Sequence, residues 1–211
     1  MAKAILFDLD GTLTDSGEGI INCAIFAMEH FDIEIPPREE LRSFVGPPLI
    51  DNFRRYGVPE ERLQEAVDVY RSRYIPIGKY ENFPYDGIEE LLRKLRRLGH
   101  RLFVATSKPE TISVDILTHF GMADYFEIIA GAGKDGLRDK KSEVIAYLLD
   151  KISGYNDIVM VGDTKFDIIG AGAHGISAIG VSWGYGDTAE MESAGAKAIA
   201  HTMDELYDLV K

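Results

Sequence analysis

The sequence predicts an α/β protein built on a doubly wound, mostly parallel sheet, with a small all-helical domain inserted after the first strand. Three observations carry this prediction. Residues 4–7 form an apolar run without alternation, which is typical of a strand buried on both faces of a parallel sheet. Residues 16–81 show helical spacing and no buried strand, whereas helices and strands alternate from residue 82 onward. We therefore expect residues 1–15 and 82–211 to form one core domain.

The inserted domain, residues 16–81, is expected to contain four helices. Apolar residues recur at helical spacing over residues 20–31. Three further helical stretches follow, each bounded by glycine or proline clusters that interrupt helices. These stretches are residues 38–44, 49–56 and 60–74.

The core is expected to consist of successive βα units. The helix at residues 87–98 is clearly indicated, because Leu91, Leu92 and Leu95 share one face and Gly99 follows its end. The expected strands after the first are 101–105, 126–130, 157–161 and 177–181. The other expected helices are 110–120, 142–152 and 203–210, and a short helix follows residue 167. A glycine-rich loop is expected at residues 131–139.

Composition narrows the class of partner. The formal net charge of −12 opposes binding to nucleic acid or to an anionic membrane surface. No apolar stretch approaches the roughly 18 residues that suggest a membrane span, and no signal-peptide pattern precedes the first strand. Cys23 is the only cysteine, which rules out an internal disulfide and fits a reducing compartment. We expect a cytoplasmic protein, monomeric or homodimeric.

Polar residues follow the ends of several expected strands. Asp8 and Asp10 come directly after the first strand, Thr106 follows the second strand of the core, and Asp163 and Asp167 follow a later one. In a doubly wound sheet the functional site lies outside the carboxyl ends of the strands, so these side chains are expected to meet. Carboxylate oxygens are the ligands that suit Mg²⁺, which usually keeps several waters and a substrate phosphate. The sequence therefore predicts a Mg²⁺ site that involves Asp8, Asp10 and Asp163.

Such a site suits the cleavage of a phosphate monoester. An aspartate can attack the phosphorus atom and form an aspartyl-phosphate. A second group must then protonate the leaving oxygen and later activate water, and Asp10 is placed to do both. Thr106 and a lysine can supply the donors and positive charge that the remaining phosphate oxygens need.

The motifs resemble those of the haloacid dehalogenase (HAD) superfamily. The resemblance rests on Asp8-Leu9-Asp10-Gly11-Thr12, on Thr106, on a lysine before a helix, and on Gly162-Asp163-x-x-x-Asp167, in that order along the chain. It implies an HAD-like Rossmannoid core with Asp8 as the nucleophile and Asp10 as the general acid/base. It also implies that Asp8, the Asp10 backbone carbonyl and Asp163 hold Mg²⁺, with Asp167 in support. The helical insertion resembles the cap of the C1 class.

The phosphate-binding residues are expected from the same motifs. Lys141 is the predicted phosphate lysine, because Lys141-Ser142-Glu143-Val144-Ile145 resembles the start of the third-motif helix, and its neighbour Lys140 is the alternative. An aspartate at position 10 favours phosphate esters over the dehalogenase branch, which typically lacks it. The full predicted phosphate-binding set is Gly11, Thr12, Thr106, Ser107 and Lys141.

Two loops point to a branch of the superfamily. Residues 44–49 and 183–186 resemble segments of the phosphoglycolate phosphatase-like and 5′-nucleotidase-like members. A small phosphorylated metabolite is therefore the expected partner, with phosphoglycolate first and a nucleoside 5′-monophosphate second. A sugar phosphatase or phosphomutase remains an alternative from the same motifs. A phospho-accepting signalling domain is the alternative of another class, although it places its acceptor after a middle strand and carries no such insertion.

Overall fold

The computed structural model describes residues 2–133, 137–152, 154 and 157–211 of the chain. The chain divides into two compact units, one formed by Met1–Thr14 and Pro84–Lys211 and the other by Asp15–Phe83. A two-stranded sheet of β2 (Thr14–Asp15) and β3 (Phe83–Pro84) lies where the chain passes from one unit to the other. Each unit is described separately below.

The first unit is built on a six-stranded sheet in the order β5-β4-β1-β6-β7-β8, in which all five pairings are parallel. This confirms the predicted doubly wound fold. Because β1 is followed outward by β4 and β5 on one side and by β6 to β8 on the other, the strand order reverses beside β1. The strands are β1 (Ala4–Phe7), β4 (Arg101–Pro109), β5 (Ile128–Ala132), β6 (Ile158–Gly162), β7 (Ser177–Val181) and β8 (Ala198–Ala200).

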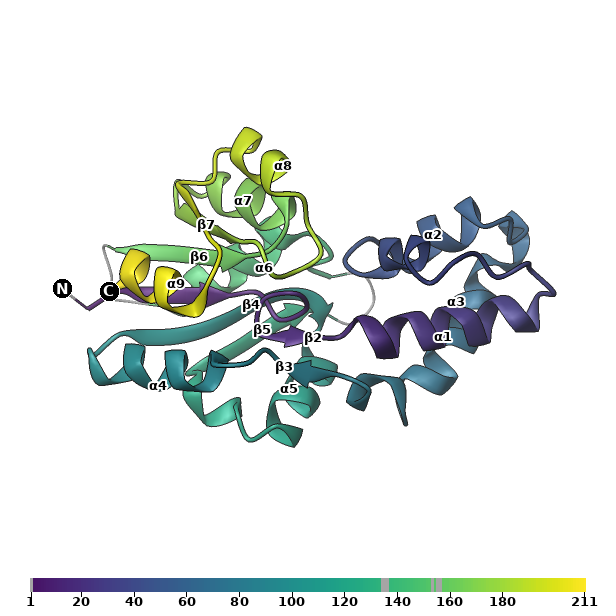
Figure 1. The fold of residues 1–211 in the computed structure, drawn as a ribbon, viewed down its shortest axis with the longest axis horizontal. Helices are drawn as coiled ribbons and strands as arrows, with labels where there is room; N and C mark the ends of the chain where they lie inside the picture. Colours follow the sequence, from purple (N-terminus) through teal and green to yellow (C-terminus); the bar gives the residue numbers. More distant parts are fainter. Residues whose placement is uncertain (1, 134–136, 153, 155–156) are drawn as a thin grey trace. The chain divides into compact units, whose positions relative to one another are not determined.

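Strand β1 is buried on both faces, as its apolar run predicts. Ile5 and Phe7 point into one hydrophobic cluster and Ala4 and Leu6 into another, and all four side chains are fully buried. Helices α4 (Ile88–Arg97), α5 (Glu110–His119) and α9 (Met203–Val210) contribute to the first cluster, and α6 (Lys141–Leu149), α7 (Lys165–Gly172) and α8 (Thr188–Ser193) to the second. Figure 1 shows α4 and α5 on one side of the sheet and α7 and α8 on the other.

The ends of the central strands are level with one another. Phe7, the last residue of β1, pairs with Val104 of β4 and with Val161 of β6. The register between β4 and β5 shifts between Ala105 and Pro109, so β4 continues to Pro109 past an irregularity at residues 106–108. The loops that follow β1 and β6, and the irregular end of β4, therefore leave the sheet at the same edge.

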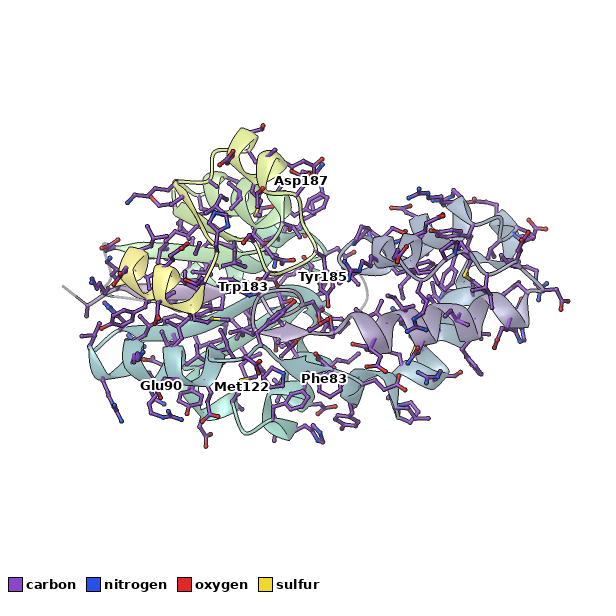
Figure 2. All side chains as sticks on the ribbon, viewed as in Figure 1. Phe83, Glu90, Met122, Trp183, Tyr185 and Asp187 are labelled. Atoms are coloured by element: carbon purple, nitrogen blue, oxygen red, sulfur yellow. The ribbon has the colours of Figure 1, made fainter. Side chains whose placement is uncertain are left out.

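The first unit differs from the sequence expectation at its edges. Helix α8 and the three-residue strand β8 were not expected, because segments this short carry little periodicity. Asp187, labelled in Figure 2, caps α8 by accepting hydrogen bonds from the backbone N–H groups of Ala189 and Glu190. Of the predicted glycine-rich loop 131–139, residues 134–136 lie outside the described part of the chain.

The second unit consists of α1 (Gly17–His30), α2 (Leu49–Arg55) and α3 (Leu63–Tyr74), with three short 3₁₀ helices, η1 (Glu40–Phe44), η2 (Glu60–Arg62) and η3 (Gly78–Tyr80). The helical stretch expected at residues 38–44 forms the 3₁₀ helix η1, which is shorter than expected, rather than an α-helix. Phe44 of η1 packs edge-on against Phe53 of α2, which itself meets Tyr70 of α3.

Among the described residues, no helix combines the length and apolar character needed to cross a membrane.

Candidate active site

The loop after β1 places two carboxylates at the edge of the sheet. Asp8 continues the strand by donating its backbone N–H to the carbonyl of Val161, at 2.9 Å. Gly11 turns the chain with a φ of 81°, a left-handed conformation that favours glycine. A Cβ atom at Gly11 would lie only 2.1 Å from Oδ2 of Asp163, so the close approach also excludes a larger residue.

Lys141 joins two of the predicted aspartates. It is the first residue of α6, and its Nζ lies 2.7 Å from Oδ1 of Asp8 and 2.8 Å from Oδ1 of Asp167. The same ammonium group donates to the carbonyl of Ala105 at 2.9 Å. Its neighbour Lys140 is exposed. Of the two lysines considered from the sequence, Lys141 is therefore the one in the carboxylate cluster.

Asp163 directly follows β6, and Asp167 lies in the first turn of α7. Both are fully buried. Asp167 occupies the third position of α7, and its Oδ2 accepts hydrogen bonds from the backbone N–H and the hydroxyl of Thr164, at 3.0 and 2.9 Å. Asp163 Oδ1 accepts from the hydroxyl of Thr12 at 3.3 Å. Thr12 thus contacts Asp163, and Asp163 and Asp167 present carboxylate oxygens within 4.8 Å of one another.

The loop after β7 packs on Asp163. The backbone N–H of Tyr185 donates to Oδ2 of Asp163 at 2.8 Å, and the indole N–H of Trp183 donates to the carbonyl of Thr12 at 3.2 Å. Trp183 and Tyr185 are labelled in Figure 2. Gly184 leaves room for this approach, because a Cβ atom there would lie 2.3 Å from Asp163 Oδ2. The loop therefore fixes the orientation of the Asp163 carboxylate.

Asp10 has a partner that sequence reasoning missed. Lys108 Nζ donates to both carboxylate oxygens of Asp10, at 2.9 and 2.7 Å, and the Lys108 side chain is only 7% exposed. The backbone N–H of Lys108 donates to Oγ1 of the buried Thr106, at 3.2 Å. Ser107, between them, is exposed. The available signal was a lysine two positions after Thr106 at the end of an expected strand.

Burial and like charges raise the pKa values of two carboxyl groups. Desolvation raises the pKa of Asp8 to about 6; Lys141 opposes the shift, while the charges of Asp167 and Asp10 add to it. Burial, with the charges of Asp167 and Asp8, raises the pKa of Asp163 well above its usual range. Burial alone lowers the pKa of Lys141, but Asp167 and Asp8 outweigh it and raise the value.

The carboxylates fit a divalent cation. Asp8, Asp163 and Asp167 each offer an oxygen atom, and these atoms lie within 4.8 Å of one another. Such hard oxygen donors are typical ligands of Mg²⁺. Two lysines face four aspartates in this site, counting Asp10, so two negative charges are left over when all four are ionised. The chemistry and the charge of the donor set both suit one Mg²⁺.

The fold and the site together define an α/β enzyme with a carboxylate site at the carboxyl ends of its central strands. The chain belongs to the haloacid dehalogenase-like hydrolase family, whose model matches residues 5–181. This match confirms the resemblance that the motifs indicated. It also decides against the alternative of a phospho-accepting signalling domain.

Relatives of the chain include several named enzymes. A 5′-nucleotidase of Pseudomonas aeruginosa is 44% identical over 191 residues, which are 90% of this chain and 86% of that protein. The tyrosine-protein kinase PtkA of Mycobacterium tuberculosis is 42% identical over 98% of this chain and 72% of its own length. A phosphoglycolate phosphatase of Chromobacterium violaceum is 32% identical over 99% of this chain and 96% of that protein.

Solved structures share the whole fold. A protein described as a predicted phosphatase from Clostridium acetobutylicum matches with a TM-score of 0.92 and 42% identity, covering 100% of this chain and 98% of its own. Together with the phosphatases among the relatives, it supports assignment of the chain to the phosphoric monoester hydrolases.

Proposed function

We propose that the chain is a Mg²⁺-dependent phosphomonoesterase that hydrolyses a small phosphorylated metabolite through a phosphorylated Asp8. The observation that carries this proposal is the buried carboxylate cluster. Lys141 joins Asp8 to Asp167, and Asp163 lies close enough to both aspartates to share one metal ion with them. Asp8 and Asp163, together with the backbone carbonyl of Asp10, would hold Mg²⁺. When bound, Mg²⁺ supplies positive charge that neutralises the carboxylates and the developing charge on the phosphoryl group.

The reaction would run in two displacements. A carboxylate oxygen of Asp8 attacks phosphorus, an O–P bond forms, and the bond to the ester oxygen breaks. Asp10 gives its proton to the departing oxygen and then, as a carboxylate, takes a proton from water. That water attacks the phosphorus of phospho-Asp8, which releases inorganic phosphate and restores Asp8.

The other residues of the site would bind and position groups. Lys141 holds Asp8 in place and is positioned to meet a phosphoryl oxygen, whereas Asp167 keeps Lys141 oriented through its own contacts with Thr164. Thr106 and Ser107 at the irregular end of β4, and Gly11 and Thr12 after β1, are the proposed hydrogen-bonding groups for the remaining phosphate oxygens.

The unit formed by Asp15–Phe83 is proposed to act as the cap, as in the C1-capped members that the helical insertion resembles. In this interpretation residues 1–15 and 82–211 are the catalytic core and residues 16–81 the cap domain. A cap of this size suits small substrates, and we propose a cytoplasmic enzyme without nucleic-acid or membrane partners.

Phosphoglycolate is the leading substrate in this proposal, and a nucleoside 5′-monophosphate is the second. The second is favoured by the 44% identity with a protein named 5′-nucleotidase. A phosphate-release screen with and without Mg²⁺ tests the proposal, using phosphoglycolate, nucleoside 5′-monophosphates, sugar phosphates and an aryl phosphate. Repeated turnover of at least one ester, only with Mg²⁺, is expected. If no ester in the panel releases phosphate, the proposal is refuted. Transfer of a phosphoryl group from ATP to a protein tyrosine would instead indicate the activity named for PtkA.

Mg²⁺ is expected to stabilise the protein in a pH-dependent manner. The pKa of Asp8 is raised to about 6, so the metal-free folded protein binds a proton there more tightly than the unfolded chain does. That stabilising protonation is lost as pH rises through about 6, and the ionised carboxylate then becomes available to the cation. Saturating Mg²⁺ should raise Tm by about 5 °C near pH 7.5, and by much less near pH 5. Thermal melts at the two pH values check this, and equal rises would contradict it.

Gly184→Ala is expected to disturb the site from the loop after β7. The new Cβ atom would lie 2.3 Å from Asp163 Oδ2 and 2.4 Å from the carbonyl of Gly11, so the loop or Asp163 must move. A displacement of about 1 Å lowers kcat/KM by about 10²-fold, and Mg²⁺ affinity should fall as well. Gly172→Ala is the matched control, because nothing lies within 4 Å of its Cβ position. Wild-type Mg²⁺ affinity in Gly184→Ala would show that the loop does not hold Asp163.

A further inference from the structure

Lys108 is a second buried lysine in the site, and the four motifs assign it no role. Its ammonium group contacts both oxygens of Asp10, and its side chain is 7% exposed against 6% for Lys141. It comes from the irregular end of β4, where its backbone N–H is bonded to Thr106. Lys108 is thus held on a different carboxylate from the ones that Lys141 joins.

A buried lysine needs a reason beyond stability. Taking an ammonium and a carboxylate out of water costs about as much as their attraction returns, so an apolar pair of similar volume packs at least as well. Asp10 is also the group that, in the proposed reaction, gives its proton to the leaving oxygen. In that reaction, a cation in contact with both oxygens of Asp10 would lie beside the leaving group.

We propose that Lys108 selects phosphate monoesters whose alcohol carries a carboxylate beside the ester oxygen. The inference rests on the proposed function and names the substrate class of that same site. A lysine ammonium is a compact charge with three donors, so it can contact two carboxylates at once. Lys141 does so in this chain, at 2.7 and 2.8 Å from Asp8 and Asp167. Lys108 would likewise join Asp10 to the carboxylate of the substrate.

The charge of the site makes such a residue necessary for an anionic leaving group. Without Lys108, the four carboxylates, Lys141 and one Mg²⁺ leave the site with one negative charge in a chain of net charge −12, so a second anion on the substrate is repelled unless a cation meets it. Phosphoglycolate has its carboxylate one carbon from the ester oxygen. A nucleoside 5′-monophosphate presents a neutral ribose there, so the role of Lys108 favours the first of the two candidate substrates.

The experiment compares phosphoglycolate with its amide, a phosphate ester of nearly the same shape whose leaving group carries no charge. Wild-type enzyme should cleave phosphoglycolate with a kcat/KM about 10- to 100-fold above that of the amide, the range for a hydrogen bond between charged groups. Lys108→Met should reduce this ratio to about 3 or less, whereas Lys108→Arg, which keeps the charge, should preserve a clear preference. Lys197→Met, which removes an exposed lysine, is the matched control and should behave as wild type.

The readout separates this role from a purely structural one. If Lys108 only positioned Asp10, Lys108→Met would lower kcat/KM by the same factor for phosphoglycolate, for its amide and for an aryl phosphate. That result would overturn the proposal. A wild-type enzyme that cleaves the aryl phosphate but does not prefer phosphoglycolate to its amide would also overturn it, while leaving the proposed function intact. If the wild-type enzyme cleaves no ester, that result would instead contradict both the proposed function and this inference.

Discussion

Asp8→Asn is expected to lower turnover of an aryl phosphate by at least about 10⁴-fold, as removal of a catalytic nucleophile does in other hydrolases. The amide oxygen of asparagine carries no charge, attacks phosphorus poorly and is a weaker ligand for Mg²⁺. The substitution preserves shape, so the variant should fold. Because the pKa of Asp8 is raised to about 6, the neutral form suits the metal-free site at neutral pH. Tm without Mg²⁺ should therefore be at or above the wild-type value near pH 7.5.

Phosphate release and thermal melts on the same preparation check both parts of this prediction. Asp208→Asn is the matched control, because Asp208 is an exposed carboxylate paired only with Lys211 among the ion pairs of the described residues. The control should retain full activity. Residual turnover above about 1% in Asp8→Asn would show that another group attacks phosphorus.

Much of the fold and part of the site follow from local patterns. The apolar residues 4–7 indicate a strand buried on both faces, and a parallel sheet then requires that Asp8 and Asp163 leave it at one edge. The parallel direction of the strands is sufficient for this conclusion. It places Lys141 near Asp8 as well, because α6 returns the chain to the strand beside β1.

The remaining contacts of the site depend on loops whose paths the pattern does not contain. Lys108 lies 98 residues from Asp10, and the bend at residues 106–108 that directs it comes from a register shift between β4 and β5. Trp183 and Tyr185 approach residues 171 and 22 positions away along the chain. Their bonds use a backbone carbonyl and a backbone N–H, which all residues except proline carry, so the residue types do not predict either contact.

Lys141→Met is expected to cost about 3–5 kcal/mol of folding stability near neutral pH in the absence of Mg²⁺. The substitution leaves Asp8 and Asp167 buried beside each other without the cation that both contact. For a chain of this length that loss corresponds to a fall in Tm of about 10 °C. Near pH 5 the loss should be smaller, because the raised pKa of Asp8 lets protonation remove one of the two charges.

Two further variants identify the cause of that loss. Lys140→Met removes the exposed neighbour and should change stability by no more than about 0.5 kcal/mol. Adding Asp167→Asn to Lys141→Met should recover part of the lost stability, since one of the two unpaired carboxylates is then neutral. Thermal melts of the single and double variants at both pH values measure these effects. A double variant less stable than Lys141→Met would mean that the hydrogen bonds of Asp167 with Thr164, and not its charge, dominate the energetics of this cluster.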